Sequence, residues 1–141
     1  MSELSGRPPR ELQADATRTA RRVFVLAGAA VAALSLMPPP ADTPLDAVPG
    51  FDKLVHLAMY ATLGVLALPA WPAAPRWRIA LALAAYGVAL EFTQGLVPGR
   101  MPSLADAVAN CTGISIMLGI AAVRARRREA AACSPRATRR G

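Results

Sequence analysis

The chain has few of the residue types, and none of the short motifs, that mark the common catalytic sites. Its 141 residues include one histidine and two cysteines, and they contain no H-x-x-x-H or H-E-x-x-H zinc-ligand pattern. A phosphate-binding glycine loop, a G-x-S-x-G nucleophile elbow and a nucleotide-binding fingerprint are also missing. We therefore expect no cofactor and no metal, and serine-hydrolase chemistry has little support.

Charged residues are scarce over long stretches of the chain. The apolar residues make up 54% of the sequence, and they fall into blocks instead of being spread periodically around a core. The blocks are Val23–Met37, Leu54–Trp71, Ile79–Val97 and Ala107–Val123. Their lengths of 15, 18, 19 and 17 residues are near what crosses about 30 Å of hydrocarbon at about 1.5 Å per residue. They predict an all-α fold, a four-span transmembrane helical bundle.

The basic residues are concentrated on one side of this predicted topology. Of the 16 lysines and arginines, all but Lys53 and Arg100 lie before the first block, between the second and third, or after the fourth. The positive-inside rule then places both termini in the cytoplasm. We expect a loosely ordered basic tail over residues 1–22, a membrane domain over 23–123 and a second basic cytoplasmic tail over 124–141. This topology explains the net charge of +7, so no nucleic-acid partner is predicted.

The first block has an alternative interpretation. A basic leader before a 15-residue apolar run also describes a signal peptide, and Arg21-Arg22-Val23-Phe24 resembles a twin-arginine export motif. However, three prolines at 38–40 follow the block directly, and a chain with three more spans has no evident reason to lose its first. We therefore expect the block to be retained.

Polar residues in or beside the predicted spans gather at one end of the bundle. The second span opens with Asp52, Lys53, His56 and Tyr60, the third closes with Glu91 and Gln94, and the fourth opens with Asp106 and Asn110. Spacings of three or four residues put the members of each set on one helical face. Because neighbouring spans are antiparallel, the three faces can meet at the extracytoplasmic end. We interpret them as a ligand-binding pocket.

The turn before the fourth span adds two residues to this pocket. Arg100 is one of the two basic residues on the outer side, and Ser103 precedes Asp106 at the spacing of a capping box. We expect Ser103 to be the N-cap of the fourth helix. Gly95, Gly113 and Gly119 are expected to allow close helix approach.

Glu91 is the most informative of these residues. A carboxylate inside an apolar span costs about 2.5–3.5 kcal/mol on insertion scales. An interhelical hydrogen bond in a membrane contributes only about 0.6 kcal/mol on average. A structural role, with the carboxyl bonded to Gln94 or Asn110, stays open, but the cost favours a functional role.

His56 is evenly balanced between two interpretations. It is either an interfacial side chain that donates to Asp52 or a backbone carbonyl, or a member of the site. Imidazole and carboxylates from His56, Glu91 and Asp106 suit zinc or manganese. Because no ligand-spacing motif supports a metal, this remains the minority hypothesis.

Four short motifs in these segments resemble the VanZ-like family of small integral membrane proteins. They are D-K-x-x-H-x-x-x-Y at 52–60, E-x-x-Q at 91–94, P-G-R-x-x-S-x-x-D at 98–106 and N-x-x-G at 110–113. The resemblance covers residues 23–123 and implies a multi-pass protein of the bacterial cytoplasmic membrane. The family's association with reduced susceptibility to teicoplanin, a lipid-bearing glycopeptide, implies a role at the cell envelope but no particular reaction.

Three functions remain open at this point. The leading one is binding or sequestration of an amphipathic ligand, such as a lipid-linked envelope intermediate or a lipoglycopeptide, beside membrane lipids. The second is an intramembrane enzyme acting on lipid headgroups, with Glu91 or Asp106 as general base, His56 as acid or metal ligand and Arg100 as anion stabiliser. The third is a structural bundle that supports another membrane protein. The oligomeric state is not predicted.

Overall fold

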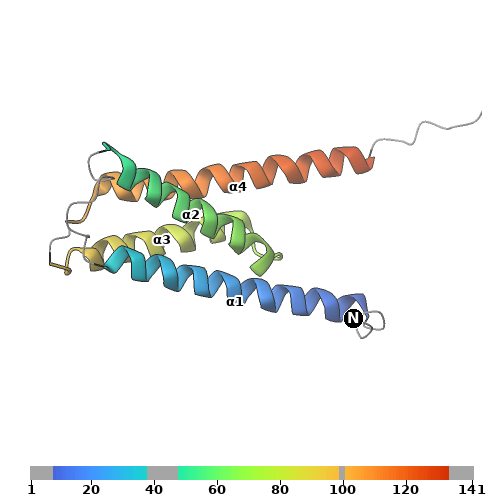
Figure 1. Ribbon diagram of the computed structural model, residues 1–141. Coiled ribbons are helices and arrows are strands. Elements are labelled where there is room, and N and C mark those ends of the chain that lie inside the picture. The colour runs from blue at the N-terminus through green and yellow to red at the C-terminus, as the bar shows by residue number, and fades with distance from the viewer. Residues whose placement is uncertain (1–7, 38–47, 99–100, 134–141) are drawn as a thin grey trace, which may run out of the picture.

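The computed structural model describes residues 8–37, 48–98 and 101–133, and these residues form four helices. Helix α1 spans Pro9–Leu36, α2 spans Phe51–Ala70, α3 spans Arg76–Gln94 and α4 spans Leu104–Cys133. No strand occurs in the described ranges. The predicted all-α helical bundle is therefore confirmed (Figure 1).

Helix α1 begins at Pro9 and not at Val23, so the expectation of a loosely ordered tail is wrong for residues 9–22. Proline is favoured at the first helical position, where its missing N–H costs no hydrogen bond. The segment that follows is rich in Arg and Ala, which are strong helix formers. Arg21 ties this extension to the bundle, because its Nε donates a 2.9 Å hydrogen bond to the carbonyl of Ala70 at the end of α2.

Helix α3 ends at Gln94, before the predicted boundary at Val97. The N–H of Leu96 donates to the carbonyl of Thr93, and the N–H of Val97 donates to that of Gln94, so the chain tightens into i→i+3 turns. Pro98 follows and cannot continue a helix. Glu91 therefore lies three residues, or about 4.5 Å, from the end of its helix.

Helix α4 is longer than its apolar block. It continues through the arginine-rich segment as far as Cys133, so the part of the predicted C-terminal tail between residues 124 and 133 is helical. Alanine and arginine dominate this part, and both have high helix propensity. In Figure 1, α1 and α4 project beyond α2 and α3 at the end where the termini lie.

Helix α2 packs between α1 and α4 and supplies much of the core. Its buried residues Tyr60, Leu63 and Ala67 pack with Leu83 of α3 and Ile114 of α4. Side chains also join α1 to its neighbours, since the rings of Phe24 and Trp71 meet edge to face at 4.8 Å between centroids. Helix α1 is thus part of the bundle.

The closest approach of α2 and α4 occurs at Gly113. A Cβ on this residue would overlap the backbone carbonyl of Leu57 and lie 3.0 Å from the amide nitrogen of Ala61. The expected role of Gly113 in close packing is confirmed. For Gly119 the same expectation is wrong, because a Cβ there would meet nothing within 4 Å.

The outside of the bundle is strongly apolar. On α3, for example, Leu81, Val88 and Phe92 are 63%, 61% and 75% exposed. Among the described helices, α1, α2 and α4 are long and apolar enough to cross a membrane. Helix α3 does not meet the same criterion, because Arg76, Arg78 and Glu91 fall within its 19 residues. A surface of this kind matches a hydrocarbon solvent.

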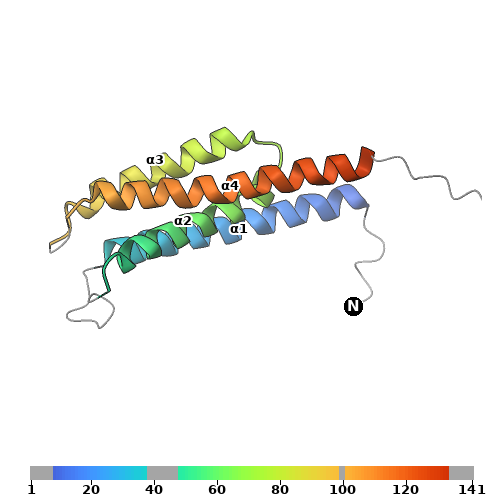
Figure 2. The same cartoon turned by 90° about the horizontal axis from the view of Figure 1, so that it is seen from above.

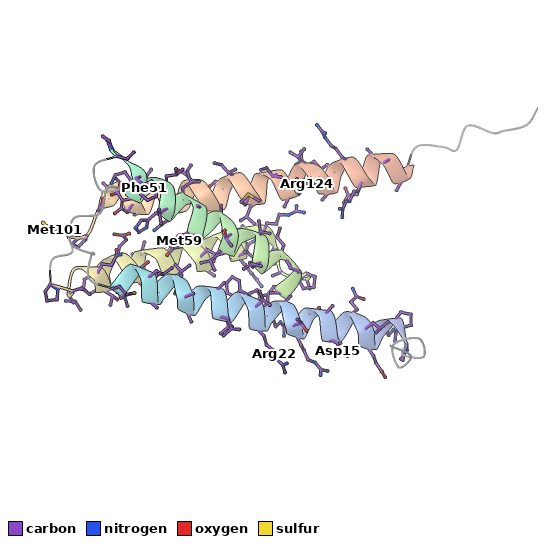
Figure 3. The ribbon with its side chains drawn as sticks, viewed as in Figure 1. Asp15, Arg22, Phe51, Met59, Met101 and Arg124 are labelled. Atoms are coloured by element: carbon purple, nitrogen blue, oxygen red, sulfur yellow. The ribbon has the colours of Figure 1, made fainter. Side chains whose placement is uncertain are left out.

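The two ends of the bundle differ in chemistry. Figure 2 shows the four helices lying lengthwise along the bundle, with consecutive helices antiparallel. In Figure 3, Phe51 and Met101 lie at one end, where α2 and α4 begin, whereas Arg22 and Arg124 lie toward the other end, which holds the start of α1 and the end of α4. Both termini therefore leave the same end of the bundle, as a four-span topology requires.

Candidate functional site

The local chain geometry brings the start of α2, the end of α3 and the start of α4 together. Gly50 precedes α2 with φ of 79°, a left-handed conformation that glycine adopts without strain. At the start of α4, the Oγ of Ser103 accepts a 3.3 Å hydrogen bond from the N–H of Asp106. The predicted N-cap role of Ser103 is confirmed.

The capping box is completed in an unusual way, because the acidic residue that receives the N–H of Ser103 is not Asp106. That N–H donates instead to Oε2 of Glu91, 3.2 Å away on α3. Glu91 is 7% exposed and thereby links the end of its own helix to the start of the next. The carboxylate of Asp106 is therefore not used for capping, and it faces Lys53 and His56 of α2 instead.

The second oxygen of Glu91 faces the polar side chains of the other helices. Its Oε1 is buried and has no hydrogen-bond partner among the described residues. Nδ1 of His56 lies 3.8 Å from this oxygen, beyond hydrogen-bond distance. A buried carboxylate oxygen without a hydrogen-bond partner is costly, so this atom is a candidate for contact with a ligand.

His56 lies between α3 and α4. Its Nδ1 is 3.1 Å from Oδ1 of Asn110, a residue that is 2% exposed. An amide oxygen only accepts hydrogen bonds, so this contact assigns His56 the tautomer with its proton on Nδ1. Nε2 then keeps its lone pair and lies 4.0 Å from Oδ2 of Asp106. One ligand atom from each of His56, Glu91 and Asp106 falls within 4.8 Å of the other two.

Lys53 lies on the solvent-exposed side of His56, Glu91 and Asp106. Its Nζ lies 2.7 Å from Oδ2 of Asp52 and 3.2 Å from Oδ1 of Asp106. Asp106 therefore offers one oxygen to the lysine and the other to His56. Because Asp52 and Lys53 are largely solvent-exposed, their ion pair contributes little to stability. Counting Glu91, the group contains three carboxylates and one ammonium.

Two predicted pocket residues lie deeper or face elsewhere. The hydroxyl of Tyr60 lies against Gly87 of α3, where the residue is 1% exposed, and it has no hydrogen-bond partner in the described part of the chain. Gln94 is also buried, but its Nε2 donates a 2.8 Å hydrogen bond to the carbonyl of Ser35 on α1. Within the described ranges, the hydrogen bond of Gln94 therefore joins α3 to α1 and not to the group around His56. Arg100 lies outside the described residues.

The residues that converge can now be separated from those that do not. The name "polar cluster" is used below for five side chains from three helices: Lys53, His56, Glu91, Asp106 and Asn110. Sequence reasoning had included all five. It missed Ser35, Gly28 and Ala70, whose backbone carbonyls accept the interhelical bonds of Gln94, Tyr86 and Arg21, because a backbone acceptor leaves no signal in side-chain chemistry.

Two larger cavities lie away from the polar cluster. One, of about 710 Å³, opens between α2, α3 and α4 and is lined by Trp71, Arg76 and Arg124 among others. The other, of about 670 Å³, is lined by apolar residues of α1, α2 and α3, including Phe24 and Leu63. Neither cavity is lined by a residue of the polar cluster, so the polar cluster lies outside both cavities.

Comparison with known protein families identifies the chain. A model of the VanZ/LLP1 family matches residues 10–125, which is most of the sequence. The chain belongs to the VanZ/LLP1 family. No curated protein and no solved structure matches the sequence.

The limits of the family match agree with the fold. The match starts at residue 10, in the polar first part of α1, and not at the apolar block that begins at Val23. The matched region therefore includes all of α1 after Pro9 and extends to the region where α4 becomes arginine-rich. Together with the three long apolar helices, it identifies a membrane protein.

Proposed function

We propose that this VanZ/LLP1 protein is a multi-pass protein of the bacterial cytoplasmic membrane, with both termini in the cytoplasm and the polar cluster on the extracytoplasmic side. The positive-inside rule supports this orientation, because Arg22 and Arg124 lie toward the end that carries the termini (Figure 3). The polar cluster is at the opposite end, at the depth where lipid headgroups meet hydrocarbon.

In this orientation, the polar cluster binds the headgroup of an amphipathic envelope molecule. A lipid-linked envelope intermediate and a teicoplanin-like lipoglycopeptide are the two ligand types of this chemistry. The observation that carries the proposal is Oε1 of Glu91, a buried acceptor with no partner among the described residues. A ligand hydroxyl or amine that donates to this oxygen would offset the cost of burying it.

A purely structural role explains only one of the two carboxylate oxygens of Glu91. The bond from Ser103 N–H to Oε2 links two helices, but a neutral amide oxygen would accept the same bond. An acidic side chain adds an insertion cost of about 2.5–3.5 kcal/mol that this bond alone does not offset. Ligand binding gives the charge and the second oxygen a role.

A second candidate function is catalysis on a lipid headgroup. The observation that favours it is the convergence of two carboxylates and one imidazole within 4.8 Å. In this scheme, Asp106 or Glu91 acts as general base and His56 as general acid. Release of the headgroup from a lipid-linked precursor by purified protein, abolished in His56→Ala, would establish it. Tight binding without turnover would favour binding alone.

Thermal unfolding in detergent tests the binding proposal. The purified protein is titrated with a lipid-linked cell-wall precursor, phosphatidylglycerol or teicoplanin, and the unfolding midpoint is followed. Saturation at about 100 times the dissociation constant stabilises the folded state by about 2.7 kcal/mol. We expect this stabilisation with at least one of the three compounds, and no shift in Glu91→Gln.

Glu129→Gln is the matched control, because Glu129 is an exposed carboxylate near the far end of α4. It should show the full wild-type shift. An equal shift in Glu91→Gln and in the wild type would contradict a role for the polar cluster in ligand binding.

A further inference from the structure

Three side chains of the polar cluster have the composition of a metal site. His56 comes from α2, Glu91 from α3 and Asp106 from α4, and their side chains are only 12%, 10% and 14% exposed. One ligand atom from each lies within 4.8 Å of the others. No short sequence motif contains these three residues, because they are far apart along the chain.

The hydrogen bond of His56 prepares the ring for coordination. Metal-binding histidines usually donate one ring N–H to a neighbouring acceptor, which fixes the tautomer and turns the other nitrogen toward the metal. The buried amide of Asn110 takes this place here, at 3.1 Å from Nδ1. Nε2 is left as the donor atom, and it faces Oδ2 of Asp106 at 4.0 Å.

Glu91 supplies an independent indication. Its Oε2 is held by the N–H of Ser103, while the buried Oε1 has no hydrogen bond within the described ranges and lies 3.8 Å from Nδ1 of the His56 ring. An oriented carboxylate with one satisfied and one open oxygen is how monodentate metal ligands are arranged. The residue is 7% exposed, so bulk water does not readily solvate the open oxygen.

The charge of the polar cluster favours a cation over an anion. In their carboxylate forms, Glu91 and Asp106 of the polar cluster and the neighbouring Asp52 together contribute three negative charges, and Lys53 offsets one of them. A phosphate entering this group directly would meet excess negative charge in a region of low dielectric. A divalent cation would instead balance the two remaining charges.

We propose that His56, Glu91 and Asp106 bind one divalent transition-metal ion, Zn²⁺ or Mn²⁺. Three protein ligands leave a coordination position open, as in sites where a metal binds a substrate. That position accepts a phosphate oxygen of the envelope lipid. This last step rests on the proposed function, whereas binding of the metal does not.

The required movement is small. Ligand atoms about 2.0–2.2 Å from a tetrahedral metal are about 3.3–3.6 Å from one another, so a pair at the 4.8 Å limit must close by about 1.2–1.5 Å. Rotation of the Glu91 and Asp106 side chains about their χ angles covers this distance. Lys53 contacts the other oxygen of Asp106, Oδ1, so it does not occupy the oxygen that faces His56.

Metal binding is tested first, in the absence of lipid. Tag-free protein in detergent is stripped with a chelator and dialysed against Zn²⁺ or Mn²⁺, and bound metal is measured by mass spectrometry. A tag-free protein is essential because His56 is the only histidine in the chain. We expect about one ion per chain and an affinity lower by a factor of about ten or more in Glu91→Gln and Asp106→Asn.

Two controls keep this result specific. Glu129→Gln should bind metal like the wild type. So should a Cys111→Ser, Cys133→Ser double variant, which removes the two thiols as adventitious ligands. Each variant is checked for helical circular dichroism and a single elution peak, so that loss of fold is recognised. Absence of bound metal in the wild type, or equal affinity in both carboxylate variants, would overturn the metal site.

The second arm separates the metal site from the proposed function. Short-chain phosphatidic acid and the diacylglycerol of the same chain length are titrated into metal-loaded and metal-free protein. We expect phosphatidic acid to bind at least about tenfold more tightly to the loaded form, and diacylglycerol to show no difference. Bound metal without any phosphate preference would refute the bridging role and leave the metal site standing. Equal lipid binding with and without metal would support the proposed function and refute the bridge.

Discussion

Replacing Gly113 by alanine should loosen the contact between α2 and α4. The added Cβ would overlap the carbonyl oxygen of Leu57 and lie 3.1 Å from its carbonyl carbon and 3.0 Å from the nitrogen of Ala61. All three atoms belong to the backbone of a helix, so none can rotate away. The two helices must therefore move apart, and the packing along their interface is lost over several turns.

The magnitude follows from two opposing terms. Overpacking in a close-packed interior costs typically about 1–3 kcal/mol. Alanine is favoured over glycine inside a helix by about 1 kcal/mol, which offsets part of this cost. We expect a net loss of up to about 2 kcal/mol in the free energy of unfolding. His56 and Asn110 are each within one helical turn of this contact, so the metal affinity of the variant should also fall.

Gly119→Ala is the matched control, because it makes the same change on the same helix where a Cβ meets nothing within 4 Å. It should leave the stability unchanged or raise it by up to about 1 kcal/mol. Unfolding of both variants by denaturing detergent, followed by circular dichroism, gives the comparison. If the two variants unfold at the same detergent fraction, Gly113 is not a point of close contact and the reasoning fails.

Two further substitutions test single hydrogen bonds by the same unfolding measurement. Tyr86→Phe removes the 2.6 Å bond from the tyrosine hydroxyl to the carbonyl of Gly28 and should cost about 0.5–1.5 kcal/mol, whereas Tyr60→Phe removes a buried hydroxyl without a described partner and should be neutral or stabilising. Equal losses in the two variants would contradict this assignment. Ser103→Ala removes the N-cap of α4 and should cost about 1 kcal/mol; Ser115→Ala, on the exposed face of α4, should cost nothing measurable, and a similar loss in both would argue against the cap.

The fold was predictable from the sequence because hydrophobic blocks of membrane length allow few structures. A backbone in hydrocarbon must satisfy its own hydrogen bonds, so four such blocks with short connections predict a helical bundle. The ends of the helices were not predictable from hydropathy. Residues 9–22 and 124–133 are polar, yet they are helical, because helix propensity and continuity with an apolar helix decide their structure.

The polar end could also be located from the sequence, but its internal pairing could not. Topology places the starts of α2 and α4 beside the end of α3, which brings five of the predicted residues together. The individual partners depend on helix rotation, which small differences in packing decide. Gln94 illustrates this point, since it shares a helical face with Glu91 but donates to α1. The bond from Ser103 to Glu91 likewise depends on how the turn between α3 and α4 folds back.

Glu91→Gln carries particular weight in the experiments on the polar cluster, because the two oxygens of Glu91 have different roles. Glutamine keeps an oxygen that can accept the bond from Ser103, and it removes the charge and the open carboxylate oxygen. If Glu91 only joins α3 to α4, the variant should be as stable as the wild type or more stable, and it should bind every ligand equally well. If the open oxygen serves a metal or a headgroup, the variant should again be at least as stable, but binding should be lost. Stability alone therefore does not separate the two cases. A stable variant that no longer binds assigns the charge of Glu91 to function, and the gain in stability measures what the native residue gives up for that function.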